Sequence, residues 1–234
     1  MKAALLLFGQ PRFLDDPMVV DSFNYLKSIF DLDVFGHTWW SEHEDEYSFS
    51  DWTNMEKCPV NKNALNIINE IYKPIEISYD SSVQFKTDKN INRFILDKFP
   101  DDKFWDKKHS NNIQSQLFSI QKVSRLFEKY KEDYDIVILD RYDTYLKHEQ
   151  DISNINKDYF YLSDIHPRFP DMVLMYGTKY LEWSSNVYDD FFDKNVYENI
   201  WKPRCEAFKA ASFMKRFDIN QARSLKIDSI AIRK

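Results

Sequence analysis

The chain has 234 residues and a net charge of −6, and no run of Lys and Arg is long enough to follow a nucleic-acid backbone. Nucleic acid is therefore not an expected partner. Aromatic residues make up 17% of the sequence and glycine occurs only 3 times, which excludes a disordered chain and a Gly-rich phosphate loop. The length allows a sizeable core, and we expect one domain over residues 1–234.

The two cysteines, Cys58 and Cys205, lie far apart and belong to no Cys/His cluster. They predict neither a disulfide framework nor a structural zinc site, and a reducing, cytoplasmic location fits them. The apolar run before Gly9 has no small-residue cleavage site, so we interpret it as a first strand and not a secretory leader. No stretch approaches the roughly 18 apolar residues of a membrane span, so we expect a soluble protein.

The chain opens with a predicted βαβ unit. Ala3 to Phe8 is apolar throughout, a helix is expected from Pro17 to Phe30, and Asp33 to Trp40 forms the next strand. Connections of this kind join neighbouring parallel strands, whose carboxyl ends lie at one edge of the sheet. The segments Gly9–Arg12 and His37–Trp40 are therefore expected at the same edge.

Strands and helices continue to alternate through the first two thirds of the chain, and shorter strands follow. This pattern predicts an α/β fold with one largely parallel sheet. Further helices are predicted at residues 63–72, 90–99, 112–130, 180–191 and 196–217, and further strands at 75–79, 159–162, 172–176 and 225–233.

Two long segments lack a regular period. Residues 41–57 are acidic and aromatic, which fits either a solvated surface loop or a lid that binds an acceptor. Residues 163–171 carry acidic, basic and histidine side chains between two predicted strands, and Pro167 and Pro170 limit the path of the chain. We expect this second loop to cover the same sheet edge as Asp143.

Residues 134–146 read YDIVILDRYDTYL. The apolar run from Ile136 to Leu139 predicts a central strand that is buried on both faces. Asp140, Arg141 and Asp143 follow it, at the end of the strand where open α/β sheets bind ligands. The two carboxylates suit a divalent cation that bridges a diphosphate, or else a solvated junction in which these side chains form surface pairs.

Neither a GxGxxG nor a GxxxxGK[ST] motif occurs, but five blocks stand in a fixed order between Lys2 and about Phe217: LLLFGQPRF, DVFGHTWW, SQLFSIQKVSRLFEKY, YDIVILDRYD and DMVLMYGTKYL. In order and spacing they resemble the small GT-A-type glycosyltransferases of bacterial polysaccharide loci and large DNA viruses. The resemblance implies a GT-A-like (Rossmann-like) domain with a mostly parallel central sheet flanked by helices and a small mixed C-terminal part. The nucleotide would bind to about residues 1–146 and the acceptor to 147–234.

The same resemblance implies transfer of a sugar from a nucleotide-diphosphate sugar to a glycan acceptor, in the synthesis of surface polysaccharide or glycoprotein glycans. Asp143 would contact the metal and diphosphate, and Asp171 would act as general base or orient the acceptor. A divalent metal, Mn²⁺ or Mg²⁺, would be held by Asp140, Asp143 and His166. The residues implied to bind the donor are Gly9, Gln10, Arg12, His37 and Arg141.

Other interpretations of these residues remain open. Gln10 and Arg12 also suit a solvated loop, His37 a hydrogen-bonded histidine at a strand end, and the pair Trp39–Trp40 core packing. A nucleotidyltransferase also uses strand-end carboxylates, although only Gly9 represents its Gly-rich signature here. A non-catalytic carbohydrate-binding protein would explain why two residues, and not one, separate the carboxylates of the acidic motif.

Overall fold

The computed structural model describes residues 1–41, 61–86, 88–102, 105, 107–146, 152–153, 155–163, 169, 173–225 and 229–231. Its strands are β1 (Lys2–Gly9), β2 (Asp31–Trp39), β3 (Glu76–Asp80), β4 (Ile136–Arg141), β5 (Thr144–Leu146), β6 (Phe160–Ser163), β7 (Leu174–Gly177), β8 (Ala222–Leu225) and β9 (Ser229–Ala231).

Seven of these strands form one sheet in the order β3-β2-β1-β4-β7-β6-β8, and β5 pairs with β9 in a separate small sheet. The first four strands of that order are parallel, β7 runs antiparallel to both of its neighbours, and β8 is parallel to β6. The predicted α/β class with a mostly parallel sheet is confirmed. The parallel pairing of β1 with β2 also confirms the predicted βαβ unit.

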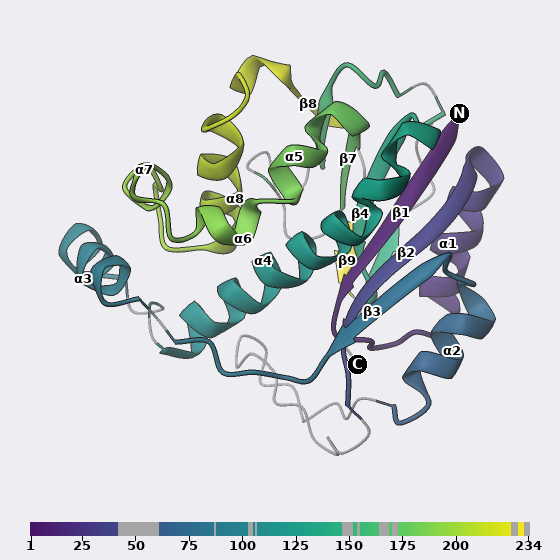
Figure 1. Cartoon of the computed structure of the whole chain (residues 1–234), viewed down its shortest axis with the longest axis horizontal. Coiled ribbons are helices and arrows are strands. Elements are labelled where there is room, and N and C mark those ends of the chain that lie inside the picture. The colour runs from purple at the N-terminus through teal and green to yellow at the C-terminus, as the bar shows by residue number, and fades with distance from the viewer. Residues whose placement is uncertain are drawn as a thin grey trace.

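Helices cover both faces of the sheet, with α4 lying across β1 and β2 on the side nearest the viewer in Figure 1. Helix α1 starts at Pro17, where the preceding Asp16 side chain accepts a hydrogen bond from the backbone N of Met18 at 3.0 Å. Among the described helices none is both long and apolar enough to cross a membrane. The α-helices are α1 (Pro17–Ile29), α2 (Ala64–Ile71), α3 (Lys89–Lys98), α4 (Lys107–Phe127), α5 (Leu181–Ser184), α6 (Val187–Asp190), α7 (Lys194–Tyr197) and α8 (Cys205–Met214).

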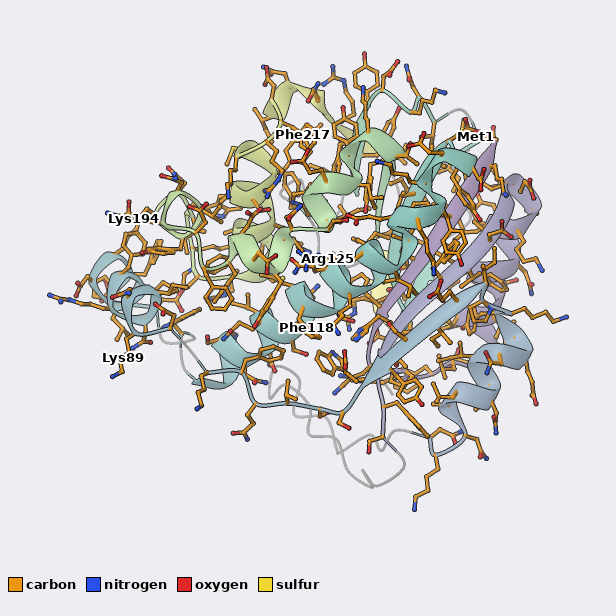
Figure 2. All side chains as sticks on the ribbon, viewed as in Figure 1. Met1, Lys89, Phe118, Arg125, Lys194 and Phe217 are labelled. Carbon is orange, nitrogen blue, oxygen red and sulfur yellow. The ribbon has the colours of Figure 1, made fainter. Side chains whose placement is uncertain are left out.

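The side chains of β1 alternate between two hydrophobic clusters, one on each face of the sheet. Those with even numbers pack with Leu117 and Ile120 of α4, and those with odd numbers pack with Phe23 and Leu26 of α1. Every side chain from Ala3 to Phe8 is buried. Figure 2 shows how densely side chains fill the space between the helices and the sheet. Burial on both faces accounts for the uninterrupted apolar sequence of this strand.

The C-terminal third differs from its prediction. The helix expected at residues 180–191 is two short helices, because the Asn186 side chain donates to the carbonyl of Glu182 at 2.8 Å and competes with continued helical bonding. The helix expected at 196–217 is interrupted around Pro203, as predicted, and resumes at Cys205. The segment 225–233, expected as a single final strand, contains the end of β8 and all of β9, which belong to different sheets.

Several predictions fall on parts of the chain outside the described residues. These parts include nearly all of the acidic segment 41–57 and most of the loop 163–171. They also include three single residues with a predicted role or state, namely Cys58, His166 and Asp171. Cys205 is described, and it is a buried free thiol in α8.

Tyr142 anchors the turn after β4 against β2. Its side chain is 1% exposed, and its hydroxyl makes no hydrogen bond within the described part of the chain. A Cβ atom on Gly36 would lie only 2.6 Å from this hydroxyl oxygen. Gly36 therefore provides the space that allows the aromatic ring of Tyr142 to pack onto the sheet.

We expect Gly36→Ala to lower the free energy of unfolding by roughly 1–3 kcal/mol, because the added methyl group overpacks this contact. Tyr142→Phe should change stability by less than about 1 kcal/mol, since it removes a hydroxyl that has no hydrogen-bond partner among the described residues. The double variant should recover part of the loss, because the clashing oxygen is absent. Urea unfolding of the four proteins measures the coupling, and strictly additive effects would contradict this account.

Candidate functional site at the carboxyl ends of β1 and β4

The turn that follows β1 is held by side chains from two other elements. Gly9, with φ of +100°, donates its backbone N–H to Ser119 Oγ at 2.9 Å and accepts from Thr38 Oγ1 at 3.2 Å. The backbone N of Arg12 donates to the carbonyl of Gln10 at 2.9 Å. Arg12 Nε also donates to Gln10 Oε1 at 2.8 Å. The two predicted donor-binding side chains of this turn therefore contact each other.

Arg141 and Asp143 form a bidentate ion pair at the end of β4. The Nε–Oδ1 distance is 2.8 Å and the Nη2–Oδ2 distance is 2.7 Å. The Arg141 side chain is 29% exposed, whereas that of Asp143 is only 6% exposed. Because Arg141 lies opposite Phe8 in the β1–β4 pairing, this pair is next to the Gly9 turn. The structure thus places Gly9, Gln10 and Arg12 after β1, and Arg141 and Asp143 at the end of the neighbouring strand β4, as two separate side-chain pairs.

Asp140 faces the layer beneath α1 and is only 5% exposed. As on any strand, alternate residues share a face, and Asp140 follows Ile138 into the layer beneath α1. It lines a pocket of about 20 Å³, beside Ser22 and Tyr72, that is far too small for a nucleotide. This position does not favour Asp140 as a metal ligand, and its assignment to a metal site stays a prediction.

Burial raises the pKa of Asp140 from 3.8 to about 7. The hydrogen bond from the Arg141 backbone N at 2.7 Å favours the charged form but does not offset its desolvation. The nearby Asp143 carboxylate raises this pKa further. Asp140 therefore exchanges its proton near neutral pH inside the core.

His37 is also placed differently from its prediction. It lies within β2 and is 0% exposed, with Nδ1 2.7 Å from Ser119 Oγ and Nε2 3.1 Å from Asp80 Oδ2. Burial lowers its pKa from 6.5 to about 4, although hydrogen bonding to Asp80 opposes that shift. A side chain without exposed surface is not placed for direct contact with a nucleotide, and the assignment of His37 to donor binding stays a prediction. It contacts instead the serine that holds Gly9.

The set Asp80, His37 and Ser119 has the partners of a hydrolytic triad but not its accessibility. Ser119 is 0% exposed, and its oxygen already accepts the N–H of Gly9. A nucleophile must reach a substrate atom, so this serine does not serve as one. Sequence reasoning missed Ser119 because its contacts join residues 82 and 110 positions apart.

The described residues do not by themselves fit a divalent metal. Both oxygens of Asp143 are bound by Arg141, and Asp140 faces α1. Within the described ranges no three His, Cys, Asp or Glu side chains form a cluster suited to a metal ion. The predicted ligand His166 and the predicted base Asp171 lie outside those ranges, so both assignments remain predictions.

The aromatic residues at the end of β2 serve packing. Trp39 is buried and stacks on Phe118 of α4, with ring centroids 5.4 Å apart and an interplanar angle of 24°. Phe118 is labelled on α4 in Figure 2. Trp40 meets Tyr79 of the edge strand β3 edge to face, with centroids 5.5 Å apart. The packing interpretation therefore holds for Trp39, whose ring is not available to stack on a sugar.

No family model matches the chain, and no curated protein matches its sequence. Among solved structures, a glycosyltransferase involved in glycosylation of the major capsid of PBCV-1 aligns with TM-score 0.41 and 7% identity, over 97% of this chain and 82% of that one. Mouse xyloside xylosyltransferase 1 in its apo form aligns with TM-score 0.42 and 9% identity, over 96% and 84% of the two chains. The glycosyltransferase GlyE of Streptococcus pneumoniae TIGR4 gives 0.40 and 10%, over 96% of this chain but 45% of GlyE. Similarity at this level does not establish a shared activity.

Replacing Asp140 by Asn should change how stability depends on pH. A carboxyl with a raised folded-state pKa stabilises the fold below its unfolded pKa and loses that contribution as pH rises through the folded value. For Asp140 this loss, on the order of 4 kcal/mol, falls between about pH 4 and 7. Asp140→Asn should therefore be more stable than the wild type at pH 8, as measured by urea unfolding.

The variant should also reveal the opposite contribution of His37. Because the folded pKa of His37 is lowered, the unfolded chain binds more protons between pH 4 and 6.5, and stability rises with pH in that window. Asp140→Asn should keep this rise, which Asp140 offsets in the wild type. Asp97→Asn, which changes an exposed carboxylate on α3, is the matched control. A variant curve parallel to that of the wild type would show that Asp140 is already ionised at acidic pH.

Proposed function

We propose that the protein is a glycosyltransferase that moves a sugar from a nucleotide-diphosphate donor to a glycan acceptor. The observation that carries the proposal is the position of Arg12 and Arg141 at the carboxyl ends of β1 and β4. The strand order reverses between these two strands, since β2 and β3 lie on one side of β1 and β4 lies on the other. Open α/β sheets bind ligands at such a reversal.

The chemistry of transfer requires positive charge at this edge. The bond from the anomeric carbon to the diphosphate oxygen breaks, a bond to the acceptor oxygen forms, and the nucleoside diphosphate departs with additional negative charge. Guanidinium groups that are already oriented stabilise such charge and bind phosphate oxygens in pairs. Asp143 fixes the plane of the Arg141 guanidinium through its two hydrogen bonds. In this proposal Asp143 acts by orienting Arg141.

The positive φ of Gly9 and the absence of a side chain there suit a backbone that approaches a donor closely. The acceptor hydroxyl must lose a proton during transfer, and Asp171 remains the proposed base for that step. A divalent metal also remains part of the proposal. Because the described carboxylates do not form a site for it, residues such as His166 would hold it. No step assigned to Arg12, Arg141 or Asp143 passes through a metal.

A second candidate is a non-catalytic protein that binds nucleotide sugars or glycans on the same fold. The observations that favour it are the ion pair that occupies Asp143 and the burial of Asp140. Such a protein would bind a nucleotide sugar without releasing nucleoside diphosphate. Incubation with UDP-, GDP- and CDP-sugars and assay of released nucleotide separates the two candidates, because only the enzyme turns the donor over.

Arg12→Ala and Arg141→Ala should each weaken binding of the nucleoside diphosphate about 10- to 100-fold, because each removes a charged hydrogen-bond donor. Isothermal calorimetry with UDP, GDP and CDP, in Mn²⁺ and in chelator, measures this loss. Arg93→Ala changes an exposed arginine on α3 and should bind as the wild type does. A wild type that binds none of these nucleotides would overturn the proposal, and release of pyrophosphate from a nucleoside triphosphate and a sugar phosphate would indicate a nucleotidyltransferase.

Asp143→Ala and Asp171→Ala should differ in their effects on binding and turnover. Loss of the Asp143 carboxylate frees the Arg141 side chain, so donor binding should fall about tenfold and turnover should be lost. Asp171→Ala should bind the donor as the wild type does and should lower turnover, because a base acts on the acceptor. Equal loss of donor binding in both variants would contradict this division of roles.

A further inference from the structure

We infer that Asp80, His37 and Ser119 form a chain of positioning residues that fixes the Gly9–Arg12 turn for the donor diphosphate. The inference deepens the proposed function and rests on it for its donor part. This chain of hydrogen bonds starts with Asp80 at the sheet edge on β3 and passes through the buried ring of His37 on β2. It ends at the Ser119 hydroxyl of α4, which holds Gly9. None of its members was predicted from sequence to hold this turn.

The hydrogen bonds of the chain run in one direction. Asp80 forms a salt bridge with Lys122 Nζ at 3.2 Å, so its carboxylate acts as a hydrogen-bond acceptor. His37 Nε2 must therefore carry the proton that it donates to Asp80. In a neutral imidazole the other nitrogen, Nδ1, is then an acceptor, and Ser119 donates its O–H to it. The Ser119 oxygen is left to accept the N–H of Gly9, as the 2.9 Å distance indicates. Each donor has one acceptor, and the arrangement is complete.

Only this one protonation state satisfies every group. A second proton on Nδ1 would compete with the Ser119 hydroxyl, whose hydrogen would lose its acceptor inside the core. The ring is 0% exposed and lies between Trp39 and Phe118, with centroid distances of 5.3 Å and 6.0 Å. The His37 ring therefore has one tautomer, and its hydrogen bonds have a fixed geometry.

The chain of hydrogen bonds holds the backbone N–H at which the Gly9–Arg12 turn begins. Gly9 is the last residue of β1, and its N–H and C=O are both held by side chains, from Ser119 and Thr38. Arg12 follows three residues later, so a change in the Gly9 torsions displaces its guanidinium. A displacement of about 1 Å in a binding group costs up to 100-fold in reaction rate. A buried serine on α4 thus determines where a charged side chain of the proposed donor site lies.

Ser119→Ala tests the inference because it removes the acceptor of the Gly9 N–H. It substitutes none of the residues that are proposed to contact the donor. Hydrogen exchange of the Gly9 amide, followed by NMR, should become about tenfold faster. Binding of the tightest nucleoside diphosphate should weaken about 5- to 20-fold. In steady-state kinetics KM for the donor should rise more than kcat falls.

Ser124→Ala is the matched control. Ser124 is equally buried on α4 but lies beside Tyr176 of β7 and not beside Gly9. It should leave Gly9 exchange and nucleotide binding within about twofold of the wild type, as expected for independent sites. Equal effects of the two serine variants would overturn the inference, because they would indicate general loosening of α4.

Two substitutions of His37 give a rescue comparison. The side-chain amide oxygen of His37→Asn can occupy the position of Nδ1 and accept from Ser119, whereas His37→Leu offers no acceptor. The asparagine variant should therefore retain slower Gly9 exchange and tighter nucleotide binding than the leucine variant, by about fivefold. Equal behaviour of the two variants would overturn the chain as the cause.

The two measurements separate failure of this inference from failure of the proposed function. Unchanged Gly9 exchange in Ser119→Ala overturns the positioning chain, whatever the protein binds. Faster exchange with unchanged nucleotide affinity overturns its role toward the donor. A wild type that binds no nucleotide overturns the proposed function and with it the donor part of this inference, while the exchange data still decide whether the chain holds the turn.

Discussion

The structure depends on the burial of β1 between two helical layers. Its side chains from Ala3 to Phe8 divide between the cluster beneath α1 and the cluster beneath α4. Burial of apolar surface stabilises a fold by roughly 25 cal/mol per Å² removed from water. A strand that is buried on both faces therefore contributes strongly to the stability of the core. The backbone of β1 cannot shift without disturbing both layers, so its last residue, Gly9, emerges at a fixed point between them. The candidate site is built around that point.

Polar groups that enter these layers have partners or altered pKa values. On the α4 side, burial lowers the pKa of His37, and each of its ring nitrogens has a hydrogen-bond partner. On the α1 side, Asp140 meets mainly apolar groups, and its pKa rises toward neutrality. The ion pair of Arg141 with Asp143 lies at the end of β4, where the Arg141 side chain is partly exposed. One short stretch therefore contains a buried carboxyl group and a paired carboxylate with different chemistry.

The sequence predicted the strands and long helices of the first 146 residues well, because their apolar residues repeat with clear periods. It also predicted that Gly9 to Arg12 and Arg141 lie at one sheet edge, which follows from parallel pairing. The direction of the Asp140 side chain was also predictable, since the period of 2 along a strand places it on the same face as Ile138. The role of Ser119 was not predictable, because no local pattern specifies a contact over 110 residues. The short helices after Gly177 lack a period long enough to define them.

The position of β1 between β2 and β4 has a consequence for folding kinetics. The register pairs Ala3 with Leu32 on one side and with Ile136 on the other, so one edge of this strand is completed only by a segment about 130 residues later. Contacts of such long range slow folding, because the loop between them must close first. During synthesis the edge of β1 that faces β4 stays unpaired until β4 has left the ribosome, and an apolar strand edge in that state is prone to aggregation. A strand that is buried on both faces in the native protein is thus open to wrong pairing in the nascent chain.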